Sequence, residues 1–209
     1  MKLGQLGELK NGLSISKEAF GKGYPFINLN DVFGRTELKE PTIDLVEVDE
    51  KTLKQFKVED GDILFVRSSV KREGVGSACL VVNPSANTVF SGFIIRFRPN
   101  QELIYPKYAS YYLNSPSIRK QILRLASSSA NTNINQPSLQ SIKVVFPALI
   151  TQFEIAERIK CLDRKINLLT KKKEALETYK KGLMQKIFSQ ELRFKREDGT
   201  DYPEWSSYC

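Results

Sequence analysis

The chain has 209 residues, enough for one ordinary globular domain with an appendage, and its 41% hydrophobic and 27% charged residues are typical of a soluble protein. No apolar stretch is long enough to cross a bilayer, and the N-terminus lacks the apolar core of a signal peptide. Three cysteines, no CxxC motif and no histidine exclude a Cys/His zinc site and favour the reducing cytoplasm.

The formal net charge of +8 is unevenly distributed along the chain. Residues 66–150 carry 10 Lys/Arg against 2 Asp/Glu, whereas residues 1–65 carry 9 against 12. A basic segment of this density indicates a polyanionic partner such as nucleic acid. A basic surface that only confers solubility explains the charge equally well.

Residues 1–150 read as one mixed α+β domain. β-rich runs at 62–67, 78–82, 88–98 and 142–146 are separated by turn residues. Short strands at this spacing predict a curled antiparallel or mixed sheet rather than a βαβ series. We expect this domain to be the one that contacts a ligand.

Two helices are predicted within the domain. One begins near Pro106, and the next begins at Ser115-Pro116, an N-cap residue followed by proline at the first helical position. The second helix places Ile118 and Ile122 on one face. A polar loop of Ser, Thr and Asn follows over residues 127–136.

A long helix is predicted from residue 151 to 188. Thr151 and Glu154 have the spacing of a capping box at its start. From there apolar residues recur four and three apart, a 3.5-residue period that makes a coiled-coil seam roughly 50 Å long. The predicted seam residues are Ile155, Ile159, Leu162, Ile166, Leu169, Leu176, Leu183 and Ile187.

Two lysines interrupt this seam and bear on how the helix pairs. Lys173 and Lys180 would oppose their own copies in a parallel, in-register dimer, which is unfavourable. An antiparallel pair or a multi-helix bundle avoids that clash. The sequence therefore predicts that another chain's helix packs here.

No catalytic or metal site is predicted. The chain has no histidine base, no GxSxG elbow, no GxxxxGK[ST] phosphate loop and no GxGxxG fingerprint. Asp31 with Glu37 and Lys39 has the residue types of a metal-dependent nuclease, but the spacing is short and such residues are common in turns. We expect no enzyme activity, and no cofactor bound by this chain.

DNA contact is the better prediction. Arginine pairs with guanine and asparagine with adenine, while lysine, serine and threonine bind phosphates. Ordinary turns, strand-edge charges and a flexible loop are the alternative explanation for each residue. The predicted DNA-contacting residues are Lys10, Asn11, Arg67, Ser68, Lys71, Arg72, Ser91, Gly92, Arg96, Thr132, Asn133 and Asn135. We expect Arg67 and residues 132–135 to read bases, and Lys71 and Arg72 to hold phosphates.

The chain resembles the specificity subunit of type I restriction–modification systems. The resemblance rests on an ordered series of short segments, and no single one of them is specific. The segments are Leu6–Gly12, Gly61–Arg67, Ser91–Pro99, Tyr111–Ser115, Ile155–Ala156, Leu162–Ile166 and Lys181–Phe188.

That resemblance implies a function without catalysis. Members of the family have two target recognition domains, each followed by a long helix, and the antiparallel helices space two domains that read a bipartite double-stranded DNA site. They recruit methylation subunits that use S-adenosylmethionine, and through them ATP- and Mg²⁺-dependent restriction subunits. The cofactors are thus expected on the partners.

This chain holds one domain (1–150), one helix (151–188) and a tail (189–209). The tail segment Phe194–Trp205 resembles the lead-in to a second recognition domain. The resemblance therefore implies a homodimer that reads a two-fold symmetric site. A stand-alone DNA-binding regulator, an inactive truncated remnant and a structural coiled-coil adaptor are the alternatives.

Overall fold

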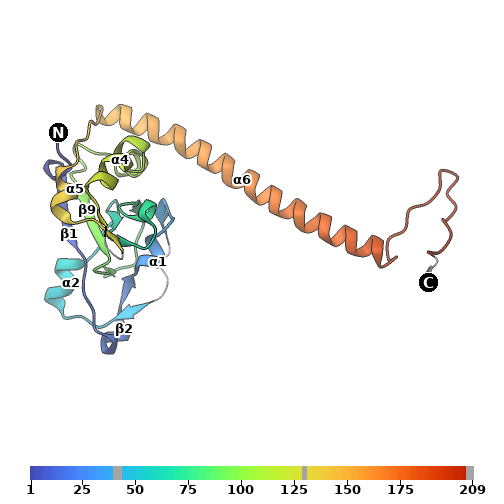
Figure 1. The fold of residues 1–209 in the computed structure, drawn as a ribbon, viewed down its shortest axis with the longest axis horizontal. Helices are drawn as coiled ribbons and strands as arrows, with labels where there is room; N and C mark the ends of the chain where they lie inside the picture. Colours follow the sequence, from blue (N-terminus) through green and yellow to red (C-terminus); the bar gives the residue numbers. More distant parts are fainter. Residues whose placement is uncertain (40–43, 129–130, 206–209) are drawn as a thin grey trace. The chain divides into compact units, whose positions relative to one another are not determined.

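The computed structural model describes residues 1–39, 44–128 and 131–205. The chain divides into two compact units, Met1–Glu157 and Arg158–Cys209, of which residues 206–209, the end of the predicted tail, lie outside the described residues. The long helix α6 (Leu149–Phe188) begins in the first unit and continues in the second (Figure 1).

A five-stranded sheet forms the centre of the first unit. Its order is β1 (Gly7–Asn11), β9 (Ile94–Pro99), β5 (Ile63–Val66), β7 (Ala78–Val81) and β3 (Glu37–Leu38). All neighbours are antiparallel except β3, which runs parallel to β7. The predicted α+β class with a mixed sheet is confirmed, and this sheet is open rather than closed into a barrel.

Both faces of the central sheet are buried. In β5, Ile63 and Phe65 belong to one core cluster, whereas Leu64 and Val66 belong to another. Because successive side chains of a strand point to opposite faces, an uninterrupted apolar strand must lie between two layers. The apolar runs of the sequence therefore specify a covered sheet.

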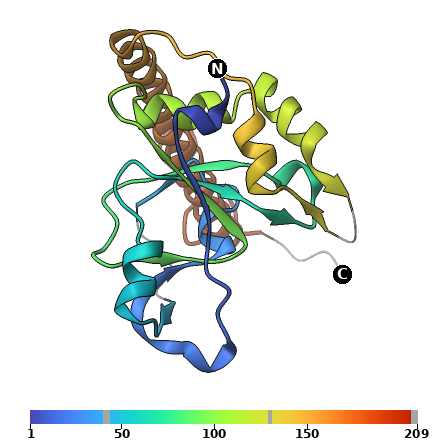
Figure 2. The same cartoon turned by 90° about the vertical axis from the view of Figure 1, so that its left-hand side faces the viewer.

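Different elements cover the two faces (Figure 2). The first cluster includes residues of α3 (Pro106–Leu113), α4 (Pro116–Leu125) and α5 (Gln136–Ser141). On the other side lie α1 (Leu29–Val32), α2 (Glu50–Phe56) and a second sheet of order β4 (Leu45–Val46), β2 (Phe20–Ile27) and β8 (Val89–Phe90). The helices predicted near Pro106 and Pro116 are confirmed.

A small polar sheet lies beside these layers. It has the order β10 (Ser127–Ser128), β11 (Thr132–Asn133) and β6 (Ser68–Ser69), with antiparallel neighbours. The predicted loop over 127–136 thus pairs with the segment that leaves β5. Short 3₁₀ turns, η1 (Leu3–Gln5), η2 (Lys17–Ala19) and η3 (Arg72–Gly74), complete the unit.

Two strand predictions require correction. The run 88–98 is not one strand, because the chain turns at Ser91-Gly92 and passes from β8 in one sheet to β9 in another. Residues 142–146 form no strand either. They form only the isolated bridge Lys2↔Lys143. The Leu3 amide donates to the Ile142 carbonyl, and the Val144 amide donates to the Met1 carbonyl.

The start of α6 is anchored to the domain by Gln152. Its Nε2 donates to the carbonyls of Leu103 (2.9 Å) and Pro147 (2.8 Å), and its Oε1 accepts from the Tyr105 amide (2.9 Å). Gln152 is fully buried, so these bonds satisfy a polar group that would otherwise be costly. The helix begins at Leu149, which places Thr151 inside it, so the predicted capping box is wrong.

In the second unit, the segment after α6 folds back on itself. The guanidinium of Arg193 donates to the carbonyls of Tyr202 and Pro203, the latter at 2.7 Å. Phe188 and Trp205 contact edge to face with ring centroids 6.2 Å apart. The described part of the predicted tail, residues 189–205, therefore forms a compact turn.

Candidate nucleic-acid interface

A cavity lined by both polar and apolar side chains opens where the three sheets of the first unit meet. Its volume is about 390 Å³. It lies at the end of β5, between β6, β11 and the turn that joins β8 to β9. The residues that line it are Leu13, Ser14, Ile15, Phe20, Phe26, Asn28, Arg67, Ser68, Ser91, Gly92, Phe93 and Asn133.

Five of the predicted DNA-contacting residues line this one cavity: Arg67, Ser68, Ser91, Gly92 and Asn133. The guanidinium of Arg67 donates through Nη1 to the carbonyl oxygen of Gly92 at 3.1 Å. This bond uses one of five N–H donors and orients the side chain along the cavity wall. The fold thus brings together Arg67 and Gly92, which are 25 positions apart in the sequence.

Glycine at position 92 allows the backbone to approach closely, as the sequence indicates. The amide of Gly92 donates to the carbonyl of Leu13 at 2.6 Å, and a Cβ atom at this position would lie 3.1 Å from the same oxygen. A larger residue would push this turn away from Leu13. The glycine therefore helps to fix the wall on which Arg67 rests.

Beside the cavity, Lys71 and Arg72 are exposed on the loop between β6 and β7. The hydroxyl of Ser69 donates to the carbonyl of Lys71 at 2.7 Å. From α4, Arg119 donates to the carbonyls of Glu73 and Val75, both at 2.6 Å. Burial lowers the pKa of the Arg119 guanidinium. The loop that presents the two cations is thus held from both sides.

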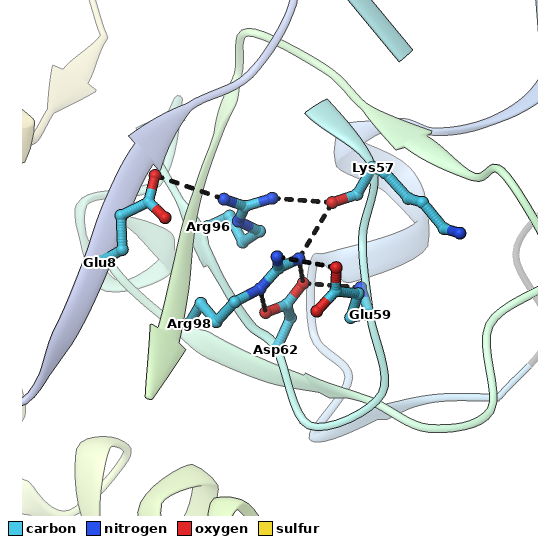
Figure 3. A network of polar contacts seen from close by, with 6 residues as sticks. All are labelled: Glu8, Lys57, Glu59, Asp62, Arg96 and Arg98. Carbon is cyan, nitrogen blue, oxygen red and sulfur yellow. Dashed lines mark hydrogen bonds and ion pairs between the residues drawn. The ribbon is translucent and has the colours of Figure 1, made fainter. Parts of the chain in front are cut away.

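Arg96, one of the predicted DNA-contacting residues, is buried in the domain. Its side chain is only 3% exposed, and Nη1 donates to the carbonyl of Lys57 at 2.7 Å (Figure 3). A carboxylate oxygen of Glu8 lies 3.6 Å from Nη2, and the guanidinium stacks over Phe90. Burial is the main cause that lowers the pKa of Arg96. Alternation along β9 points this residue inward, where it connects Lys57 and Glu8, and its contact with DNA stays a prediction.

Arg98 forms the second half of the same network. Its Nε and Nη2 each donate to a carboxylate oxygen of Asp62 at 2.8 Å, and Nη1 pairs with Glu59 at 2.9 Å (Figure 3). Asp62 is 1% exposed, and its hydrogen bond raises the pKa of Arg98. This fork-to-fork pair fixes the turn that precedes β5.

Ser91 and Thr132 do not present their side chains freely. They are 4% and 6% exposed, respectively. The Ser91 hydroxyl accepts from the Phe93 amide at 3.3 Å, and Thr132 lies opposite Ser69 in the polar sheet. Both residues stay predicted DNA contacts, although little of either side chain reaches the surface in this conformation.

The remaining predicted residues lie around the cavity rather than in it. Asn135 is the N-cap of α5, where its Oδ1 accepts from the Ser138 amide at 2.8 Å. The ammonium of Lys10 lies 4.6 Å from the centre of the Phe56 ring. Asn11 is exposed at the end of β1. Of these three, only Asn11 is presented to solvent without a described side-chain contact.

Seven residues of the cavity wall were not predicted from the sequence: Leu13, Ser14, Ile15, Phe20, Phe26, Asn28 and Phe93. Asn28 is also the N-cap of α1, where its Oδ1 accepts from the Leu29 amide at 2.8 Å, so its residue type alone did not indicate a place in the cavity wall. Phe93 was read as part of an apolar strand. The break at Ser91-Gly92 was the available signal, since it shifts the alternation and exposes this ring.

The nuclease-like residues have structural roles. Asp31 is 1% exposed and accepts from the Asn28 amide at 2.8 Å, which caps α1. Glu37 pairs with Lys39 and Lys107. Among the described residues, no group of three or more Cys, Asp or Glu side chains is placed to hold a metal ion.

The predicted seam of α6 presents large apolar side chains. Leu162, Ile166, Leu169 and Leu176 are 56–60% exposed. Ile155, Ile159, Leu183 and Ile187 are half-buried, while Lys173 and Lys180 are exposed. In the part of the chain that the structure describes, no helix has the length and hydropathy of a membrane span.

Comparison with protein families gives one match that covers most of the chain. A family model described as the type I restriction modification DNA specificity domain matches residues 1–178. The type I restriction enzyme EcoKI specificity subunit of Escherichia coli K12 is 29% identical over 159 residues, which are 75% of this chain and 34% of that protein. The putative MjaX specificity subunit of Methanocaldococcus jannaschii is 25% identical, over 94% of this chain and 47% of that one.

Solved structures show the same fold. A chain from a type I R-M system complex superposes with a TM-score of 0.68 at 20% identity, over 91% of this chain and 44% of that one. The HsdS subunit from Thermoanaerobacter tengcongensis gives a TM-score of 0.59 at 19% identity, over 92% of this chain and 45% of that one. The chain thus spans between a third and a half of the length of the proteins it matches.

Proposed function

The chain belongs to the family of type I restriction–modification DNA specificity domains, and from this premise we propose that its first unit reads one half of a bipartite DNA site without catalysing a reaction. The observation that carries the proposal is the cavity that gathers Arg67, Ser68 and Asn133 beside the exposed cations Lys71 and Arg72. Base-reading groups and phosphate-binding groups thereby share one surface, as sequence-specific recognition requires.

Each part of this surface has a distinct role in the proposal. Arg67 retains donors for the O6 and N7 acceptors of guanine, and the amide of Asn133 suits adenine. One Asn133 donor is engaged, because Nδ2 bonds the carbonyl of Asn131 at 2.9 Å. Lys71 and Arg72 neutralise phosphates and set the register of the protein on the duplex.

The second part of the proposal is that two copies pair through antiparallel α6 helices. The ten seam positions, including both lysines, are spaced symmetrically about residue 171. An antiparallel pair centred there places Ile166 opposite Leu176 of the other copy. The same register sets Lys173 opposite Leu169, and Lys180 opposite Leu162. Neither seam lysine then faces its own counterpart, and the exposed leucines are covered.

Pairing would give the assembly a two-fold axis, so the two recognition domains would read identical half-sites in inverted orientation. We further propose that the paired helices recruit adenine methylation subunits, and through them restriction subunits. S-adenosylmethionine, ATP and Mg²⁺ would be held by those partners. A regulator that binds DNA alone, or an inactive remnant, would share the cavity but recruit no partner.

Selection of duplexes from a random pool by the purified full chain tests the DNA-reading function. We expect enrichment of an inverted repeat with a fixed spacer, and binding that falls as salt rises. An asymmetric enriched site would contradict the homodimer. A pool that shows no enrichment would contradict the reading function.

A further inference from the structure

Phe93 is an exposed aromatic residue directly before a buried strand. Its side chain is 57% exposed, whereas Ile94 and Ile95 are fully buried. A phenylalanine ring stabilises a fold mainly when it is buried, where its apolar contribution is among the largest. Because the Phe93 ring is more than half exposed, it contributes little to the stability of the domain. The exposure of Phe93 therefore needs an explanation other than packing.

The backbone at Phe93 is fixed by a set of hydrogen bonds. Its amide donates to the Ser91 hydroxyl at 3.3 Å, and its carbonyl accepts from the Arg67 amide at 2.8 Å. The next amide, of Ile94, donates to the Ser91 carbonyl at 2.9 Å. A ring mounted on such a turn is held at one place on the surface, so little backbone freedom is lost when it contacts a ligand.

The side chains around Phe93 are of the kinds that bind a nucleobase. The same cavity wall holds the Phe20 side chain, 41% exposed, together with the guanidinium of Arg67 and the amide of Asn133. An aromatic face contacts the face of a base, and the polar groups contact its edge. This combination of an aromatic face with polar groups at its edge therefore favours a nucleobase over a protein side chain as the ligand.

We propose that Phe93 enters the base stack of the bound half-site, with its ring against a base next to the one that Arg67 contacts. The inference rests on the proposed DNA-reading function and adds to it a local deformation of the duplex. An apolar wedge partly unstacks one base step and kinks the helix, at least cost at pyrimidine–purine steps. Part of the specificity then comes from how easily that step deforms.

The test uses the selected duplex with 2-aminopurine placed at successive positions of one half-site. Wild-type chain should raise the fluorescence at one position, because unstacking relieves quenching. Phe93→Ala should abolish that rise and weaken binding about 5- to 100-fold, the loss of one base–aromatic stack. Phe93→Trp should restore both. Leu103→Ala is the matched control, since Leu103 is an apolar residue, 49% exposed, that does not line the cavity.

Thermal unfolding of each variant separates loss of fold from loss of contact. If folded Phe93→Ala binds and raises fluorescence as the wild type does, the inference is overturned while DNA reading stands. It is also overturned if the variant binds DNA normally but no longer captures methylation subunits, because the ring then contacts protein. If the wild type itself selects no duplex, the proposed function fails instead.

Discussion

The recognition domain and the long helix use their apolar residues in opposite ways. In the domain, Leu64 and Phe65 of β5 are fully buried on opposite faces of one sheet. On the helix, Ile166 and Leu176 are more than half exposed. The apolar side chains of the domain are buried within one copy of the chain, whereas those of the helix seam are exposed and would be buried only against a second surface.

The same contrast holds for polar groups. In the domain, Asp62 and Arg98 are paired through two hydrogen bonds, and Gln152 uses both its acceptor and its donors. On the helix, the lysines at positions 171–173 are exposed. Changes in the domain should therefore act on stability or DNA contact, and changes on the seam should act on assembly.

The largest effect is expected from charges introduced into the seam. The double substitution Ile166→Asp and Leu176→Asp places carboxylates opposite each other in the proposed register, so the dimer should weaken more than about 1,000-fold. Sedimentation velocity measures this change. Leu168→Asp is the matched control, because Leu168 is also 59% exposed but lies off the seam. Equal effects of both changes would contradict the seam.

The next effect concerns the domain alone. Asp62→Ala leaves Arg98 without its main partner in a buried network, and we expect a loss of about 3–5 kcal/mol in the free energy of unfolding. Urea denaturation measures it. Glu59→Ala should cost far less, since the Glu59 side chain is 55% exposed. An unchanged midpoint for Asp62→Ala would show that the network does not stabilise the domain.

Substitutions in the cavity and in the basic loop should separate base reading from phosphate binding. Arg67→Ala should cost about 1–3 kcal/mol on the selected site and relax base preference at one position. Lys71→Ala should weaken binding to all sequences alike and reduce the salt slope by about 1. Titration of matched and mismatched duplexes measures both. Lys54→Ala, an exposed lysine on α2, is the control. A uniform loss for Arg67→Ala would refute its role as a reader.

Salt should affect the two regions in opposite directions. DNA binding should weaken with a slope near 0.9 per phosphate contact. The dimer should tighten a few-fold, because the two lysine clusters at 171–173 lie near each other at the centre of an antiparallel pair, and salt screens their repulsion. Dissociation constants at 50 and 200 mM salt give both trends. A dimer that weakens with salt would contradict the antiparallel register.

The smallest effect is a difference in thiol reactivity. Burial raises the pKa of the Cys79 thiol to about 12, whereas Cys161 is exposed on α6. In a Cys209→Ser background, Cys161 should react rapidly with a disulfide reagent at pH 8, and Cys79 only on unfolding. Two fast thiols in the native protein would show that the core of the domain opens.

The sequence predicted the elements whose signals are local. The seam of α6, the proline-started helices α3 and α4, and the strands β5 and β7 all follow from periodicity and turn residues. The cavity was only partly predictable. Arg67 and Asn133 were identified by residue type, but their proximity depends on β6 pairing with β11, a contact between distant segments.

The errors have physical causes. Arg96 was included among the DNA-contacting residues by its residue type, yet the Lys57 carbonyl and Glu8 give it partners within the domain. Phe93 was predicted to lie within the continuous run 88–98, but the break at Ser91-Gly92 leaves its ring exposed. In both cases the outcome depended on where β9 begins, which a single sequence does not specify to the residue.

We propose that two identical copies of the chain bind two identical half-sites and direct a methylation subunit to them. Co-expression of the chain with its methylation subunit, followed by long-read mapping of methylated adenines, tests it most directly. We expect methylation at an inverted repeat with a fixed spacer, and we expect it to be lost when Ile166→Asp and Leu176→Asp are introduced together. Methylation at an asymmetric motif, or at the same motif with the seam disrupted, would contradict it.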